Sequence, residues 1–159
     1  MEATTKAIVL CVACLFVGSA KDSWGAAQCQ PDKDHRQVIE NFNKITEGFN
    51  NKDWSLIEPR VDNDISLTRL ERNGKTHKKS KADYKKHLED DAWKKDPNWD
   101  KVECDTPSDI MSGLIKLVVT YQFTFTQNGQ KNIGPAFAVM LFKHDDGKLV
   151  DFTVGSLSK

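Results

Sequence analysis

Two side chains in this sequence have the chemistry of an acid–base catalyst, His87 and Asp151. His87 follows Tyr84 by one turn of an expected helix, so both can lie on one face, and an imidazole exchanges protons near neutral pH. Asp151 lies between Val150 and Phe152 in a strand-like segment, where a buried carboxylate would be a candidate functional group. Each also has a simpler interpretation: His87 on a helix surface, and Asp151 on the water-facing side of its strand.

Motifs for metal, nucleotide or serine-hydrolase chemistry are missing from the sequence. The 4 histidines are scattered and form neither His-x-x-His nor His-Glu-x-x-His nor a cluster with cysteine. There is also no glycine-rich phosphate loop and no Gly-x-Ser-x-Gly elbow. Lys+Arg 23 balances Asp+Glu 23, which argues against a general nucleic-acid binder. We therefore predict no metal, no cofactor and no nucleic-acid partner.

The first 20 residues have the pattern of a secretory signal peptide. A lysine precedes an apolar run from Ala7 to Val17, and small residues follow. This run is shorter than the roughly 20 residues of a membrane-crossing helix. We expect cleavage after Ala20, or alternatively after Ala27, and a secreted protein whose mature form has no membrane span; an uncleaved signal anchor is the other interpretation. The mature chain would consist of an N-terminal segment, 21–33, and a single domain, 34–159.

Cleavage would leave two cysteines, Cys29 and Cys104, because Cys11 and Cys14 lie within the signal peptide. An even number of cysteines in an exported protein favours a disulfide bond. We expect this bond to tie the N-terminal segment to the sheet. Two free thiols, or a redox pair, remain the alternative.

Three segments have the periodicity or capping signals of helices. The first runs from Asp34 to Asn50, and a second, from Trp54 to Glu58, begins after Asp53 as its cap. Ser80 is expected to cap a third helix with Tyr84 on its apolar face. The apolar residues of the first helix recur at three- and four-residue steps, namely Val38, Ile39, Phe42, Ile45 and Phe49.

The remaining segments are strand-like. An Asn-Gly pair predicts a hairpin that joins 64–71 to 76–79. Further strands are expected at 101–105, 110–127, 133–143 and 148–157, the last three as an antiparallel meander. Along the long strand apolar and polar residues alternate, so one face is apolar and the other wet. The apolar face carries Leu117, Val119, Tyr121, Phe123 and Phe125.

This order of elements resembles the nuclear transport factor 2-like superfamily, which includes SnoaL-like cyclases and ketosteroid isomerases. The resemblance rests on FNNKDWSLI (49–57) followed by DNDISL (62–67), on the basic hairpin before Ser80, and on VMLF (139–142) followed by DGKL (146–149). It spans His35 to Leu157 and implies an α+β fold. A curved antiparallel sheet would wrap around the N-terminal helices as a cone, or cystatin-like α+β roll, whose open end admits a small apolar ligand.

The resemblance also bears on catalysis. Ketosteroid isomerases use a tyrosine of the first helix and two carboxyl groups on strands. The corresponding positions here are Ile45, Thr68 or Arg69, and Pro135 or Ala138, and none of these side chains is such an acid or base. Without an oxyanion donor this chemistry loses several kcal/mol of stabilisation, so we expect no isomerase activity of that type.

The resulting hypothesis is a secreted, non-catalytic binding module with an apolar pocket for a small hydrophobic ligand. Two alternatives stay open: a small isomerase, dehydratase or cyclase that uses His87 or Asp151, and a protein-interaction module, for example a homodimer, that uses the outer sheet face with Thr120, Gln122 and Thr124. The tryptophans Trp54, Trp93 and Trp99 either line the ligand mouth or fill the core. The expected pocket wall consists of Phe42, Trp54, Tyr84, Tyr121, Phe123 and Phe137.

Overall fold

The computed structural model describes residues 29–30, 33–71, 73–90, 98–110 and 112–157. The expected signal peptide, both of its cleavage sites and Trp93 lie outside the described residues. Within the described part of the chain, no helix is long and apolar enough to cross a membrane.

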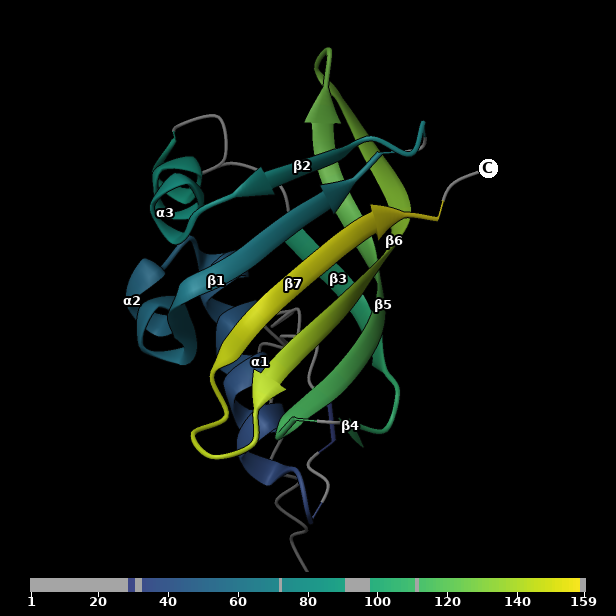
Figure 1. Ribbon diagram of the computed structural model, residues 1–159. Coiled ribbons are helices and arrows are strands. Elements are labelled where there is room, and N and C mark those ends of the chain that lie inside the picture. The colour runs from purple at the N-terminus through teal and green to yellow at the C-terminus, as the bar shows by residue number, and fades with distance from the viewer. Residues whose placement is uncertain (1–28, 31–32, 72, 91–97, 111, 158–159) are drawn as a thin grey trace, which may run out of the picture.

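A curved seven-stranded sheet stands in front of the first helix in Figure 1, with two shorter helices at one edge. The strand order is β2-β1-β7-β6-β5-β3, and β4 pairs with β5. The helices are α1 (Arg36–Asn51), α2 (Trp54–Ile57), the 3-10 turn η1 (Glu58–Arg60) and α3 (Lys81–Glu89). The strands are β1 (Val61–Leu70), β2 (Thr76–Lys79), β3 (Asn98–Cys104), β4 (Ser108–Ile110), β5 (Leu114–Gln127), β6 (Gln130–Lys143) and β7 (Leu149–Ser156).

The predicted α+β class and the antiparallel meander are confirmed, because β5, β6 and β7 pair in sequence as antiparallel neighbours. Two details differ from expectation. The sheet is mixed, since β1 runs parallel to β7. The strand expected at 110–127 starts later, as β5 at Leu114, because Ser112 and Gly113 before it form a turn with positive φ angles, and Ile110 instead ends the separate short strand β4.

The helices form where their sequences predict them. The five apolar residues of the α1 stripe are all buried. Gly48 near its end permits close contact with the next element, because a Cβ there would lie 2.8 Å from Ile57 of α2. Asp53 caps α2 by accepting a hydrogen bond from the Ser55 backbone N–H. Ser80 caps α3 as predicted, in a capping box that it forms with Asp83.

The disulfide predicted between Cys29 and Cys104 is formed, with the two Cα atoms 5.7 Å apart. It joins the segment before α1 to the end of β3. Asn43 of α1 holds the same segment through both polar atoms of its side-chain amide. Its Oδ1 accepts from the Cys29 N–H at 2.9 Å, and its Nδ2 donates to the Cys29 carbonyl at 3.1 Å. The start of the described chain is therefore fixed to both the helix and the sheet.

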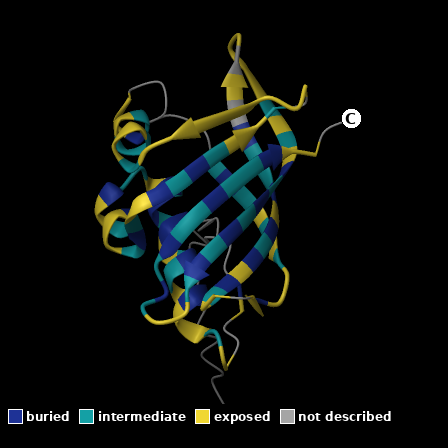
Figure 2. Ribbon diagram, viewed as in Figure 1, coloured by how far each residue is buried: buried dark blue, intermediate teal, exposed yellow. Residues whose placement is uncertain are grey.

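The two faces of the sheet differ in burial, as the alternating colours along the second half of β6 in Figure 2 show. The inner face, which the helices cover, carries the buried residues Leu117, Val119, Tyr121, Ala138, Met140 and Phe152. The outer face is less polar than expected. Beside the exposed Thr120 it bears half-buried Phe137, Val139 and Leu141, because β6 lies centrally and is apolar on both faces. Thr124 is buried and donates to Asp100 Oδ2 at 2.7 Å.

Candidate ligand-binding cavity

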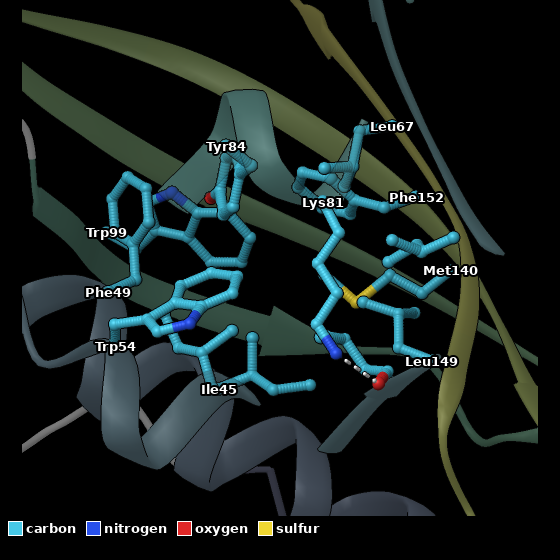
Figure 3. Close-up of a pocket in the computed structure, with 13 residues that line it drawn as sticks. Ile45, Phe49, Trp54, Leu67, Lys81, Tyr84, Trp99, Met140, Leu149 and Phe152 are labelled. Atoms are coloured by element: carbon cyan, nitrogen blue, oxygen red, sulfur yellow. Dashed lines mark hydrogen bonds between the residues drawn. The ribbon is translucent and has the colours of Figure 1, made fainter. Parts of the chain in front are cut away.

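A small cavity lies between the helices and the inner face of β1, β6 and β7 (Figure 3). The volume open to the centre of a water molecule is about 20 Å³, which is roughly the room needed for one water. The interior of the cone is thus nearly filled by side chains. The residues that line the cavity are Ile45, Phe49, Trp54, Ile57, Val61, Ile65, Leu67, Lys81, Tyr84, Trp99, Met140, Leu149 and Phe152.

One wall of the cavity is a rigid aromatic stack centred on Trp99 of β3. The Trp99 ring stacks on Tyr121 with centroids 4.4 Å apart and on Phe152 with centroids 5.7 Å apart. Phe49 of α1 lies at 5.2 Å from the same indole. Asn50 fixes the backbone beneath it, since its Oδ1 accepts from the Trp99 N–H and its Nδ2 donates to the Trp99 carbonyl. This wall is built from four elements and has little freedom to move.

Trp54 of α2 and Tyr84 of α3 line the cavity beside Trp99 and Phe49 in Figure 3, and their rings meet edge-on with centroids 6.4 Å apart. Burial raises the pKa of the Tyr84 hydroxyl far above its ordinary 10.0, and the nearby Tyr121 adds to this effect. The tyrosine is therefore a neutral group at physiological pH. The indole Nε1 of Trp54 is buried and has no hydrogen-bond partner among the described residues.

Lys81 is the one charged residue among the described residues that line the cavity. Its side chain runs along the wall from the first turn of α3, and Figure 3 shows its ammonium group bonded to an oxygen at the lower edge. The Nζ atom donates to the carbonyls of Glu58 and Val61, both at 3.3 Å, and to Asn63 Oδ1 at 3.1 Å. All three acceptors are neutral oxygens.

The structure places two of the six expected pocket residues, Trp54 and Tyr84, in the cavity wall. Phe42 lies on the same α1 stripe as Ile45 but is fully enclosed in the core. Tyr121 lies behind Trp99, and Phe123 packs edge-on against Tyr121 further along β5. These three therefore support the wall without lining the cavity.

Phe137 lies on the outer face of the sheet, opposite to the expected side. It pairs with Gly155 of β7, and its ring covers that glycine so closely that a Cβ there would lie 2.6 Å from the ring. The neighbours Ala136 and Ala138 are buried on the inner face. Because β6 is apolar on both faces, its sequence alone does not indicate which set points inward.

The two acid–base candidates lie away from the cavity. His87 is half-buried on α3, and its pKa is lowered mainly by burial and further by the charges of Lys79 and Arg69, against an opposing effect of Asp90. Asp151 lies on the outer face of β7 and accepts a hydrogen bond from Thr153 Oγ1 at 3.3 Å. The lining residues themselves include no carboxyl and no imidazole group.

The positions compared with ketosteroid isomerases divide between the two faces. Ile45 lines the cavity, and Ala138 is buried on the inner face. Arg69 lies on the same face of β1 as the cavity residue Leu67, two positions further along the strand, whereas Thr68 and Pro135 belong to the outer set.

Sequence reasoning missed most of the aliphatic wall and Lys81, the one charged group that the described part of the chain contributes to it. Leu67 and Phe152 could have been found from strand alternation, since they are paired neighbours on the inner faces of β1 and β7. Lys81 follows the Ser80 cap directly, and this position at the start of α3 gave no signal that its side chain lies along an apolar wall.

Comparison with known proteins supports the fold and nothing finer. No protein family and no curated protein matches the sequence. Solved structures do match over most of the domain. A ketosteroid isomerase-like protein from Erwinia carotovora atroseptica SCRI1043 has a TM-score of 0.61 at 9% identity and covers 80% of this chain and 99% of its own. An NTF2-like protein with a cystatin-like fold from Novosphingobium aromaticivorans has a TM-score of 0.57 at 8% identity, covering 79% and 82%.

A putative polyketide cyclase from Xanthomonas campestris pv. campestris is similar to the same extent, with a TM-score of 0.56 at 14% identity over 77% of this chain and 91% of its own. This chain has the nuclear transport factor 2-like fold. The resemblance inferred from the order of elements is confirmed at that level. Within the NTF2-like fold, the described residues include no cluster of three or more histidine, cysteine or acidic side chains that could hold a metal ion.

Proposed function

We propose that this protein is a secreted module that binds a small apolar ligand in the cavity between its helices and its sheet, without covalent chemistry. The observation that carries the proposal is the composition of the wall: of the 13 lining residues, all except Lys81 present apolar or aromatic side chains. Such a wall with few polar groups is typical of small-molecule sites. The enzyme alternative is not pursued, because neither His87 nor Asp151 lines the cavity.

A ring-sized ligand needs more room than the present cavity offers, so binding must move part of the wall. The aromatic stack around Trp99 is fixed by four elements, whereas Tyr84 belongs to α3, in which Leu88 is the only buried residue. We therefore expect the Tyr84 side chain to move when a ligand binds. A ligand that buries about 200 Å² of apolar surface would gain roughly 5 kcal/mol before the cost of moving the side chain.

Export is supported by the pattern of residues 1–20 and by the disulfide between Cys29 and Cys104. Disulfide bonds form and persist in oxidising compartments such as the secretory pathway and the extracellular space. A ligand carried there would be shielded from water by the apolar wall.

The proposal is tested by titration with the neutral fluorescent probe N-phenyl-1-naphthylamine. Val61 lines the cavity, whereas Val139 lies on the outer face of the sheet. Val61→Phe therefore fills the cavity, and Val139→Phe makes the same substitution on the opposite face as a control. We expect saturable binding to the native protein and to Val139→Phe, and at least tenfold weaker binding to Val61→Phe.

A second variant guards against misfolding of the overpacked Val61→Phe protein. Met140→Ala removes buried atoms from the same wall and should tighten probe binding if the cavity is the site. Absence of saturable binding to both the native protein and Met140→Ala would contradict the proposed function.

A second candidate function is self-association through the outer face of the sheet. On this face β6 presents the apolar Phe137 and Leu141, and Ile133 continues the row with 62% exposure. Lys116 of β5 and Asp151 of β7 are the register partners that flank Leu141 on either side. If two copies pack face to face with their twofold axis along β6, each Lys116 lies opposite Asp151 of the second copy. The face is thus self-complementary in charge as well as apolar at its centre.

A further inference from the structure

We propose that the ligand of the cavity is a small carboxylic acid in its anionic form, with its carboxylate bound by Lys81 and Trp54 and its hydrocarbon body against the apolar wall. This inference rests on the proposed function and specifies the ligand class of the same site. It rests on two polar groups at the otherwise apolar wall, the indole N–H of Trp54 and the ammonium group of Lys81.

The first group is the indole N–H of Trp54. The Trp54 side chain lines the cavity, the residue is 9% exposed, and its Nε1 has no partner among the described residues. A buried donor without an acceptor costs free energy, so such groups are rare in folded proteins. In Figure 3 the nitrogen lies at the edge of the indole next to Ile45, which also lines the cavity. A ligand oxygen in the cavity would supply the missing acceptor.

The second group is the ammonium of Lys81. Its three acceptors are neutral oxygens at 3.1 to 3.3 Å, longer than the roughly 2.8 Å of a charge-assisted hydrogen bond to a carboxylate. Among the described residues no ion pair is recorded for this ammonium group, which lies at the edge of an apolar wall. A ligand carboxylate would provide one, whereas a neutral ligand would bury more apolar surface against a charge that stays uncompensated.

The surroundings of the cavity favour the same sign of ligand charge. Lys79 of β2 is the register partner of the cavity residue Leu67, and Arg69 follows on the same face of β1. The positive charges of both residues reach the neighbouring α3, where they lower the pKa of His87. On α3 itself, the Asp83 carboxylate is engaged with the Ser80 N–H and hydroxyl in the capping box. Lys79, Arg69 and Lys81 thus place three positive charges on the elements at this edge, which favours an anionic ligand over a cationic one.

The ligand must combine one acceptor-rich anionic end with a compact apolar body. An ammonium ligand would find no carboxylate partner among the described residues that line the cavity. A purely hydrocarbon ligand would offer no acceptor to the Trp54 N–H and no negative charge to Lys81. Short-chain fatty acids and aromatic acids have the required chemistry.

The test compares hexanoate with 1-hexanol, which has the same chain length and no charge, as competitors for bound N-phenyl-1-naphthylamine. We expect hexanoate to displace the probe from the native protein at a concentration at least tenfold lower than 1-hexanol. Lys81→Met should abolish this preference while the probe still binds. Lys86→Met serves as the matched control, because Lys86 is an exposed lysine of the same helix outside the cavity, and it should keep the preference.

Trp54→Phe gives a second, independent readout if Lys81→Met fails to fold. It keeps an aromatic ring but removes the N–H donor together with part of the indole, so the readout is the ratio of hexanoate to 1-hexanol affinity, which should fall three- to tenfold even if the larger cavity tightens probe binding. Equal displacement of the probe by hexanoate and 1-hexanol would overturn the assignment of a carboxylate ligand. It would not contradict the proposed binding of an apolar ligand in the cavity. Absence of saturable probe binding to the native protein would overturn the proposed function and this inference together.

Discussion

The phenol ring of Tyr84 meets the indole of Trp54 edge-on, with ring centroids 6.4 Å apart and an interplanar angle of 61°. The two rings come from α3 and α2 and line the cavity next to the Trp99 stack (Figure 3). Trp54 belongs to α2, whose residue Ile57 packs closely on Gly48 of α1, whereas Tyr84 belongs to a helix with one buried residue, Leu88. Tyr84 is therefore the part of the wall with the least support.

Tyr84→Ala should enlarge the cavity at a moderate cost in stability. Truncating a half-buried aromatic side chain should lower the free energy of unfolding by about 2–3 kcal/mol, less than for a fully buried ring. The same change should tighten binding of N-phenyl-1-naphthylamine, because the probe no longer has to displace the ring. Urea unfolding and fluorescence titration measure the two effects. Tyr84→Phe keeps the ring and is the control, and tighter binding to that variant as well would show that the ring is not the obstacle.

Much of the fold follows from local sequence signals. The stripe of α1, the Ser80 capping box and the Asn-Gly hairpin each act within a few residues, and each predicted its element. The parallel pairing of β1 with β7 had no such signal, because it joins segments from opposite ends of the domain and no local turn sets their register.

The Asp62–Lys143 ion pair should make part of the stability depend on pH. Asp62 Oδ2 accepts from Lys143 Nζ at 2.6 Å, and this hydrogen bond is the largest cause that lowers the Asp62 pKa below its ordinary 3.8. Because the unfolded chain then binds the proton more readily than the folded one, the stabilisation is present above about pH 4 and is lost as the pH falls through the folded-state pKa. The pair ties the start of β1 to the end of β6.

The measurement is the urea midpoint as a function of pH. Asp62→Asn should reduce the fall of the urea midpoint below about pH 4. Asp105→Asn, at an exposed residue after β3, is the control and should show the same fall as the native protein. A fall that is identical in native protein and Asp62→Asn would contradict the assignment to this pair.

The disulfide should contribute a large share of the stability. It closes a loop with a sequence separation of 75 residues, for which the chain-entropy model gives about 4 kcal/mol. The double variant Cys29→Ser/Cys104→Ser should lose about this amount of its free energy of unfolding, measured with urea. The hydrogen bonds between the backbone of residue 29 and the Asn43 side chain should persist. Native protein treated with reductant should match the double variant. A loss below about 1 kcal/mol would show that the unfolded chain is not constrained as the model assumes.

The candidate site was less predictable than the fold because it depends on how distant elements meet. Trp54 and Tyr84 could be placed on the inner side from helix periodicity and capping. Phe137 could not be oriented, since both faces of β6 are apolar and the face is decided only by its neighbours β5 and β7. Lys81 reaches the cavity by bonding to backbone carbonyls of η1 and β1, a tertiary contact without a sequence pattern.

Self-association through the outer face can be tested by charge reversal. If each Lys116 faces Asp151 of a second copy, Lys116→Glu or Asp151→Lys alone should weaken the dimer by at least tenfold, through like-charge repulsion at two symmetric places. The double variant Lys116→Glu/Asp151→Lys should restore it, because the pairs are then reversed and intact. Sedimentation velocity over a concentration series measures the dissociation constant. Lys86→Glu, at the exposed lysine of α3 away from β6, controls for net charge. A native protein that stays monomeric, or a double variant no tighter than the singles, would contradict this arrangement.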